Sequence, residues 1–83
     1  MSKPVCRNHS DGSKSWFLNG QLHREDGPAV EWPDGEKHWY LNGQLHREDG
    51  PAIEWGNGTK QWWINGRNVT ESEHLLQRLA RIR

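Results

Sequence analysis

The sequence predicts a mainly β fold: a short, curved antiparallel meander of repeated β-hairpins that ends in a C-terminal amphipathic α-helix. Three observations predict it. A 23-residue segment recurs along the chain, two tight-turn dipeptides stand in each period, and leucines recur at helical spacing after the last turn. The 83 residues are enough for one compact domain, 1–83, and too few for two.

The repeat has two complete copies, 13–35 and 36–58, which align without a gap and are identical at 17 of 23 positions. A partial third copy covers 59–69, and an eroded copy or N-terminal strand covers 1–12. Units that bury a face only against a neighbour are typical of stacked repeat arrays. We therefore expect about three units stacked in chain order.

Each unit carries two turn signals. One is an Asn-Gly dipeptide, which accepts the positive φ angles of a type I′ hairpin turn. It stands at 19–20, 42–43 and 65–66. The other is Asp-Gly or Asn-Gly, at 11–12, 34–35 and 57–58. Two turns in 23 residues leave room only for short antiparallel strands, of which we expect about six.

A Gly-Pro pair interrupts each complete repeat, at 27–28 and 50–51. Proline cannot donate to a strand ladder, so the His-Arg-Glu-Asp segment before each pair is interpreted as a bent connection. Within it, Arg24 and Arg47 are expected to pair with nearby carboxylates, and the Asp-Gly steps to fold turns.

Alternation along the strands separates two faces. Five tryptophans are assigned to the core: Trp16, Trp32, Trp39, Trp55 and Trp62. An aromatic ladder, Phe17, Tyr40 and Trp63, falls on the opposite face, one residue per unit, and we expect Glu31 and Glu54 to flank it. Because exposed aromatic residues at regular intervals are typical of an interaction site, these five residues are predicted to bind a partner.

The segment 70–83 predicts a helix. Thr70 and Glu73 form a capping-box pattern. Four apolar residues follow at helical spacing: Leu75, Leu76, Leu79 and Ile82. We expect this stripe to be buried against the sheet as an end cap. Arg78 and Arg81, near the basic C-terminal end, complete the predicted partner-binding residues.

The block Asn-Gly-Gln-Leu-His-Arg-Glu-Asp-Gly-Pro-Ala, at 19–29 and 42–52, and the Asp-Gly or Asn-Gly step after each Glu-Trp pair resemble the MORN-repeat variant of bacterial, bacteriophage and giant-virus proteins. The resemblance covers about residues 11–68. It implies a curved hairpin meander used for protein contacts, or for lipid contact in some eukaryotic relatives, and no catalytic residues. A short array without an effector domain is similar to small phage accessory proteins, which implies a host protein as partner, inhibited or redirected.

Composition narrows the function. Eleven Lys and Arg balance eleven Asp and Glu, so the formal net charge is zero, which disfavours binding to nucleic-acid phosphates or anionic lipid. The sequence has no long apolar run and no signal-peptide pattern at its start, so we expect a cytoplasmic protein, in the host cytoplasm if it is viral. The single Cys6 cannot form an internal disulfide.

The repeated blocks also offer His, Glu and Asp at 23, 25 and 26 and again at 46, 48 and 49, as in a metal site or an acid-base pair. Repeated polar blocks more often fix loops, and no Ser or Cys nucleophile stands in a comparable block. We therefore expect no metal, no cofactor and no enzyme activity.

Together these patterns predict a non-catalytic protein–protein interaction module. Two alternatives stay open: a lipid or membrane-surface adaptor, and a single-stranded nucleic-acid binder that uses the aromatic ladder. A homodimer through an exposed sheet edge or face is a further partner that we consider.

Overall fold

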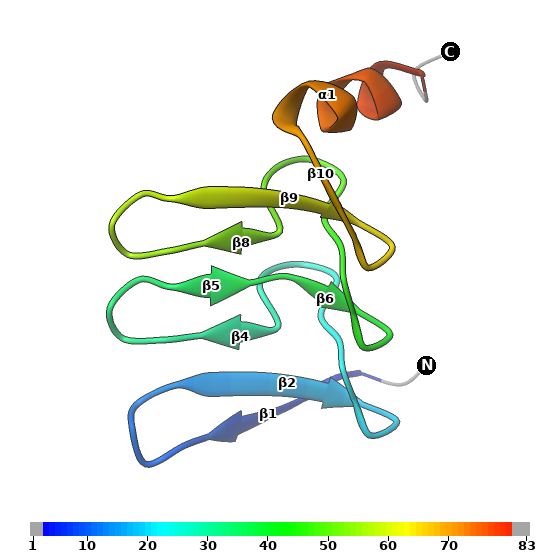
Figure 1. The fold of residues 1–83 in the computed structure, drawn as a ribbon. Coiled ribbons are helices and arrows are strands. Elements are labelled where there is room, and N and C mark those ends of the chain that lie inside the picture. The colour runs from blue at the N-terminus through cyan, green and yellow to red at the C-terminus, as the bar shows by residue number, and fades with distance from the viewer. Residues whose placement is uncertain (1–2, 81–83) are drawn as a thin grey trace.

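The computed structural model describes residues 3–80, which form a slab of 40 × 35 × 18 Å. This part of the chain contains ten short strands and one helix (Figure 1). The elements are β1 (Val5–Asn8), β2 (Lys14–Leu18), β3 (Gln21–Leu22), β4 (Val30–Glu31), β5 (Lys37–His38), β6 (Tyr40–Leu41), β7 (Gln44–Leu45), β8 (Ile53–Glu54), β9 (Lys60–Ile64), β10 (Arg67–Val69) and α1 (Glu71–Ala80).

The strands form an open antiparallel sheet in the order β1-β2-β4-β5-β8-β9-β10. Strand β3 pairs with β2, and β6 pairs with β7. The chain climbs the stack from β1 at one end to α1 at the other (Figure 1). The predicted fold class, a hairpin meander with a C-terminal helix, is therefore confirmed. The strands outnumber the expected six because the Asn-Gly hairpins add β3, β7 and β10, and because Trp39 separates β5 from β6.

Both predicted turn types are present. At the Asn-Gly turns the asparagines have φ of 50–53° and the glycines φ of 77–80°, as a type I′ turn requires. At the other turns only the glycine is left-handed, with φ of 88–97°. There the Asp or Asn side chain accepts the backbone N–H two residues later, as Asp34 does from Glu36 at 3.0 Å.

The interior differs from the predicted tryptophan core. The buried apolar side chains are Ala29, Val30, Ala52, Ile53, Ile64 and Val69. All five tryptophans assigned to the core are only half-buried. No second layer packs on this sheet within the described residues, so only loops and hairpins cover its faces. They are wide enough to bury small side chains, whereas the larger tryptophan rings stay partly exposed.

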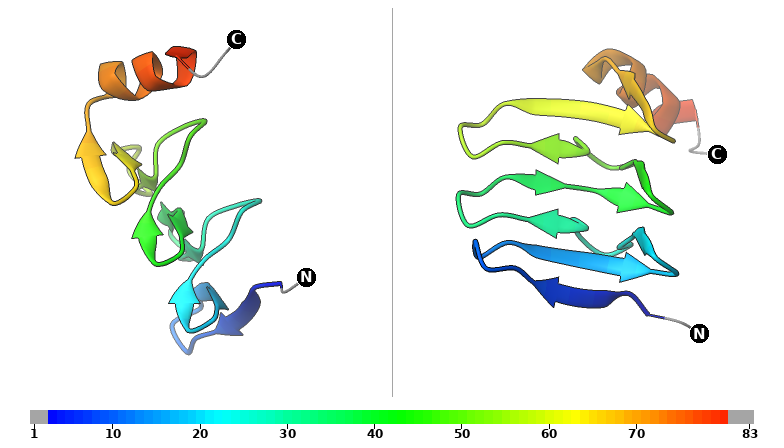
Figure 2. Two further views of the ribbon diagram at one scale, coloured as in Figure 1. Left: turned by 90° about the vertical axis from the view of Figure 1, so that its right-hand side faces the viewer. Right: turned by 60° about the horizontal axis from the view of Figure 1, so that its bottom comes forward.

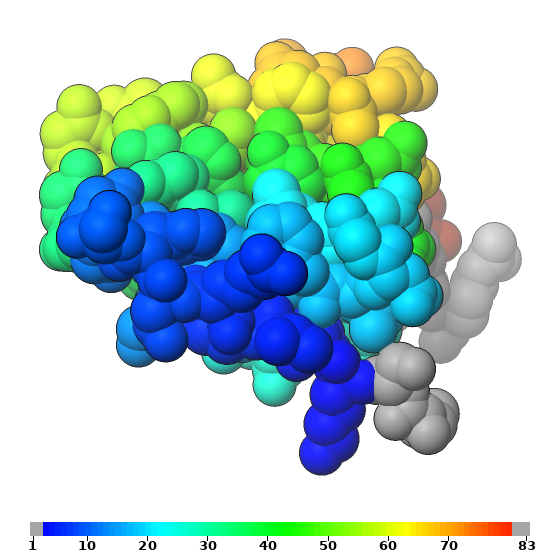
Figure 3. All heavy atoms as spheres, turned by 90° about the horizontal axis from the view of Figure 1, so that it is seen from below, coloured from blue at the N-terminus to red at the C-terminus, as the bar shows by residue number. Residues whose placement is uncertain are grey.

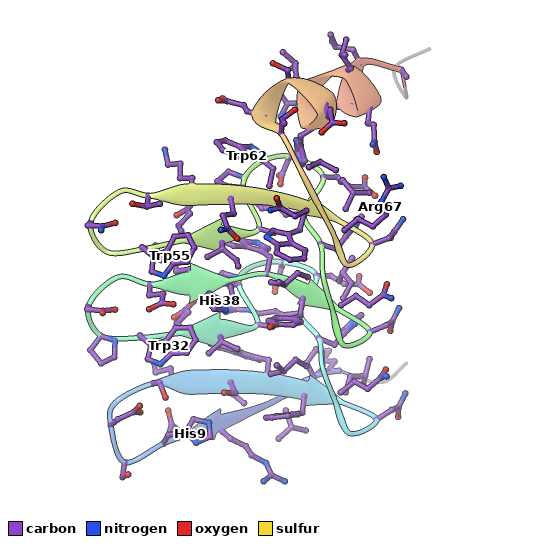
Figure 4. All side chains as sticks on the ribbon, viewed as in Figure 1. His9, Trp32, His38, Trp55, Trp62 and Arg67 are labelled. Carbon is purple, nitrogen blue, oxygen red and sulfur yellow. The ribbon has the colours of Figure 1, made fainter. Side chains whose placement is uncertain are left out.

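Strand register also corrects the assignment of faces. Val30 lies opposite Ser15 and His38, so it shares the face of Phe17 and Tyr40. Trp32 follows the same alternation, and its ring lies 4.7 Å from that of His38 (Figure 4). Trp16, Trp39 and Trp62 occupy the other face. The predicted single core face was therefore wrong, because pairing across the Gly-Pro break, rather than alternation within one strand, decides which segments share a side.

Helix α1 begins as the capping box predicts. The backbone N–H of Thr70 donates to Glu73 Oε1 at 2.8 Å, and the N–H of Glu73 donates to Thr70 Oγ1 at 3.0 Å. The hydrogen bond from the Thr70 backbone, followed by the interaction with its hydroxyl, holds the pKa of the Glu73 carboxyl below its ordinary value. The predicted N-terminal boundary of the helix is confirmed.

The expected burial of the helix stripe was wrong. Leu75, Leu76 and Leu79 are 44%, 65% and 53% exposed, and Ile82 lies outside the described residues. The buried residue of α1 is His74, which is 3% exposed and donates from Nε2 to the carbonyl oxygen of Arg47 at 2.5 Å. A hydrogen bond from His74 to Arg47, rather than burial of the predicted apolar stripe, therefore joins the helix to the rest of the fold.

The opposite end of the stack is formed by β1 and the turn that leads into β2 (Figure 3). All four residues of β1 are exposed, including Cys6. Within residues 3–80, no helix combines the length and the apolar character that crossing a bilayer demands.

Candidate binding face

Two loops define one side of the molecule. The first loop, 23–28, connects β3 to β4, and the second loop, 46–51, connects β7 to β8. They project from the same side of the sheet, one above the other (Figure 2, left). We call this side the loop face. It contains both copies of the His-Arg-Glu-Asp segment, so equivalent residues of the two repeats lie on the same side of the molecule.

An arginine organises the first loop. Nη1 of Arg24 donates to the carbonyl oxygen of Pro28 at 3.1 Å and to Oε2 of Glu31 at 3.2 Å, while Nε donates to Asp26 at 3.2 Å. The guanidinium also lies over the ring of Trp16, with Cζ 3.8 Å from its centroid. The predicted pairing of this arginine with nearby carboxylates is confirmed.

The second loop repeats the arrangement. Arg47 donates to Asp49 at 3.0 Å, to the carbonyl of Pro51 at 3.1 Å and to Glu54 at 3.2 Å, and stacks over Trp39 at 3.7 Å. Corresponding distances in the two loops agree within 0.2 Å. A Cβ on Gly50 would lie 2.9 Å from Arg47 Cζ, so this position requires glycine if the guanidinium is to stay in place.

A buried histidine connects each loop to the next unit. The backbone N–H of Asn42 donates to His23 Nδ1, and that of Asn65 donates to His46 Nδ1, both at 2.9 Å. Accepting these bonds requires Nδ1 to carry no proton, so Nε2 bears the hydrogen and points toward Glu25 at 3.4 Å in the first loop. These histidines serve as structural ties between units.

The carboxylates of the loops lie outermost. Side-chain exposure is 81% for Glu25, 90% for Asp26, 56% for Glu48 and 81% for Asp49, whereas the two arginines are 22–23% exposed. We call these four residues the acidic rim. The outer edge of the two loops therefore presents negative charge to solvent, with the loop arginines beneath it.

Three grooves follow one another along this face, and each is lined by the equivalent tryptophan. The lower groove, 580 Å³, lies beside Trp16 and the first loop. The middle groove, also 580 Å³, runs between the two loops beside Trp39. The upper groove, 330 Å³, separates the second loop from α1 beside Trp62, which Figure 4 shows between β9 and the helix. The repeat thus creates a series of similar recesses.

The aromatic ladder lies on the other face. Phe17 is paired with Leu22, Tyr40 with Leu45 and Trp63 with Asn68, and all three aromatic residues are half-buried. Register places the ladder on one side of the sheet, as predicted.

Glu31 and Glu54 do not flank the ladder. Glu31 lies opposite Lys14, and Glu54 lies opposite both Lys37 and Lys60, which assigns both glutamates to the other face, the one that carries Trp16 and Trp39. There they bind Arg24 and Arg47. The sequence interpretation was wrong here for the same reason as for Val30. Alternation along one strand does not determine which face the residues after the Gly-Pro pair occupy.

Of the two predicted arginines of the helix, Arg78 is described, and it lies apart from the ladder. Arg78 is exposed and lines the upper groove, and Arg81 falls outside the described residues. The six described residues of the predicted binding set therefore do not form one surface.

The alternative metal and acid-base interpretations rest on the His, Glu and Asp residues of the two loops. Within residues 3–80, no three His, Cys, Asp or Glu residues gather in a way that could hold a metal ion. A His9 Nε2 to Ser15 Oγ contact of 2.9 Å joins a base to a hydroxyl, but Ser15 is buried and lines none of the three grooves.

Sequence reasoning missed the stacking of each arginine on a tryptophan and the grooves beside it. A signal was present: tryptophan, arginine and glycine recur at the same spacing, as Trp16, Arg24 and Gly27 and then as Trp39, Arg47 and Gly50. Comparisons of the chain with protein-family models, with curated proteins and with solved structures find no match.

Proposed function

We propose that the protein is a non-catalytic protein-binding module whose loop face engages a basic segment of another protein. The observation that carries this proposal is the acidic rim. Two copies of one loop hold exposed carboxylates above largely covered arginines, with the middle groove and Trp39 between them. Electrostatic complementarity of this kind favours partners rich in Lys and Arg and speeds their association.

The resemblance to MORN-type repeats of phage and bacterial proteins supports the same class of function, and a host protein inhibited or redirected by binding remains the partner we propose. The acidic rim opposes the two alternatives. Anionic lipid and nucleic-acid phosphate would both be repelled by carboxylates that are 56–90% exposed.

The test uses an arginine-rich peptide, with a glutamate-rich peptide of equal length as the negative probe, in titration calorimetry. Asp26→Asn combined with Asp49→Asn should weaken binding about fivefold to tenfold, since each exposed charge pair contributes roughly 0.2–1 kcal/mol. Raising the salt concentration should weaken it further.

Asp34→Asn is the matched control. It removes a carboxylate from a turn away from the loops, and Asn57 already makes the same turn bond in the next unit, to Thr59 at 3.0 Å. Binding by this variant should change less than about twofold. Equal losses in the two variants, or equal binding of the two peptides, would contradict the proposal.

The ladder remains the second candidate surface, and Tyr40→Ala separates it from the loop face. If Tyr40→Ala abolishes capture of the native partner while Asp26→Asn with Asp49→Asn does not, the partner binds the ladder. Circular dichroism of each variant establishes that the fold is intact.

A further inference from the structure

Helix α1 is docked by its polar side. Successive residues are about 100° apart around a helix, so His74 and Leu76 are about 200° apart and point to opposite sides. His74 is buried and bonded to Arg47. Glu71, Leu75 and Arg78 line the upper groove on the same side of the helix, which leaves Leu76 and Leu79, 65% and 53% exposed, directed away from the sheet.

An apolar stripe that faces solvent on a capped helix marks an interaction surface. Leu76 and Leu79 point away from the sheet, and Leu75, which is 44% exposed, lies between them and the upper groove. We call these three residues the leucine stripe. Leu76 and Leu79 stay more than half exposed in the described part of the chain, so this surface is open to a second molecule.

The charges beside the stripe match a second copy of the same helix. Glu71 lies in the first turn of α1 and Arg78 in the last, and both lie on the flank that lines the upper groove. When two such helices pair antiparallel about a twofold axis, this flank of one meets the same flank of the other, so Glu71 of each copy faces Arg78 of its partner. In a parallel pair this flank would instead meet the opposite flank of the partner, so Glu71 would not reach Arg78.

We propose that the leucine stripe is a homodimer interface in which two α1 helices pack antiparallel across a twofold axis. A ten-residue helix is about 15 Å long, so the contact is smaller than a standard protein–protein interface. The dimer should therefore be weak, with a dissociation constant in the micromolar range, and should leave the acidic rim and the middle groove of each copy free.

Sedimentation equilibrium of the full chain over a range of concentrations tests this proposal. Leu76→Glu should weaken dimerisation by about a hundredfold, because a carboxylate would be buried in an apolar contact. Gln77→Glu adds the same charge at the next position, off the stripe, and should change the dissociation constant less than about threefold. Leu76 is exposed in the single chain, so both variants should fold.

A charge exchange tests the orientation. Glu71→Arg and Arg78→Glu should each weaken the dimer by about tenfold, because each places like charges opposite one another. Both substitutions in one chain should restore it to within about threefold, and a mixture of the two single variants should form a heterodimer. Failure of the combined variant to recover overturns the antiparallel arrangement.

Three results overturn the interface itself. The wild-type chain could stay monomeric at all concentrations up to the millimolar range. A dimer could persist in Leu76→Glu and disappear in Val5→Glu, which would assign it to the exposed edge of β1. A monomer that floats with anionic phospholipid vesicles, and loses this on Leu76→Glu, would make a membrane the occupant of the stripe.

Discussion

The two complete repeats and the terminal unit cover the same tryptophan in different ways. In the repeats, Trp16 and Trp39 lie beneath arginines supplied by the following loop, at 3.8 and 3.7 Å. The equivalent Trp62 has threonine where that arginine would stand, and it lies in the groove below α1 instead. Each of the three equivalent tryptophans is thus partly covered, while the chemistry of the cover changes at the end of the stack.

The histidine ties differ in the same way. Positions 23 and 46 hold histidines that accept from the next hairpin, but the equivalent position in the terminal unit is Val69, which has no further hairpin to bond. His74 acts in the opposite direction and donates back to the second loop. We call the bonds of His23 and His46 to the following hairpin the upward ties, and the bond of His74 to the preceding loop the downward tie. The stack ends where the downward tie takes the place of an upward one.

The largest expected effect tests whether the two repeats are energetically equal. Arg24→Ala and Arg47→Ala should each cost about 3 kcal/mol, because each uncovers a tryptophan and leaves a half-buried glutamate unpaired. The exposed pairs to Asp26 and Asp49 add little. Denaturant midpoints measure the losses, with exposed Arg67→Ala as the control. A difference of more than about 1 kcal/mol between the two loops would break the equivalence.

A smaller loss is expected for the upward ties. His23→Ala and His46→Ala should each cost about 2 kcal/mol, since a buried ring is removed and a backbone N–H loses its acceptor. Exposed His9→Ala should cost less than about 1 kcal/mol. Urea unfolding compares the three. If His9→Ala proves as costly as the other two, histidine burial is not what joins the units.

The downward tie should be weaker still. His74→Ala removes one hydrogen bond to the Arg47 carbonyl and should cost about 1 kcal/mol. Amide hydrogen exchange should speed up in α1 and in the second loop, while the first loop keeps its protection. Faster exchange throughout the chain would mean that the cap supports the whole stack rather than its last unit.

The smallest effect concerns the start of the cap. Because the folded Glu73 carboxyl has a pKa below its ordinary value of 4.5, its capping contribution is complete above that pH and is lost as pH falls through the lowered pKa. The Thr70 amide resonance should shift over this range in NMR spectra. Glu73→Gln keeps a capping acceptor and should abolish the shift. A titration unchanged in that variant would exclude Glu73 as its source.

The pKa of the Asp11 carboxyl is also lowered, so its titration must be followed separately from that of Glu73. Its pKa is lowered by hydrogen bonds from the Ser13 hydroxyl and then the Ser13 backbone N–H. The Ser13 amide reports this group, so the two carboxyls can be followed independently.

Local chemistry made much of the fold predictable. The Asn-Gly turns, such as 42–43, and the capping box at Thr70 and Glu73 are each determined within a few residues, so sequence alone identifies them. That Arg24 pairs with carboxylates could also be predicted. Which carboxylate it meets was not, because Glu31 reaches the guanidinium only when β4 lies beside β2.

Faces and docking orientation required information from distant segments. Alternation placed Val30 correctly within its own strand, but its side of the sheet depends on pairing with Ser15 and His38. The leucine stripe predicted the buried side of α1 from hydrophobicity alone. A single contact between His74 and a loop 27 residues earlier reversed that prediction.

The hairpins on the Asn-Gly side are joined by hydrogen bonds of one kind, from Gly43 N–H to the Leu22 carbonyl and from Gly66 N–H to the Leu45 carbonyl, both at 2.9 Å. Because every joint is the same, a gene duplication that adds one 23-residue unit would lengthen the slab without altering either end. Each added unit would bring one more pair of outward carboxylates. The valence of the loop face could therefore evolve by copy number alone, with no new side chain required.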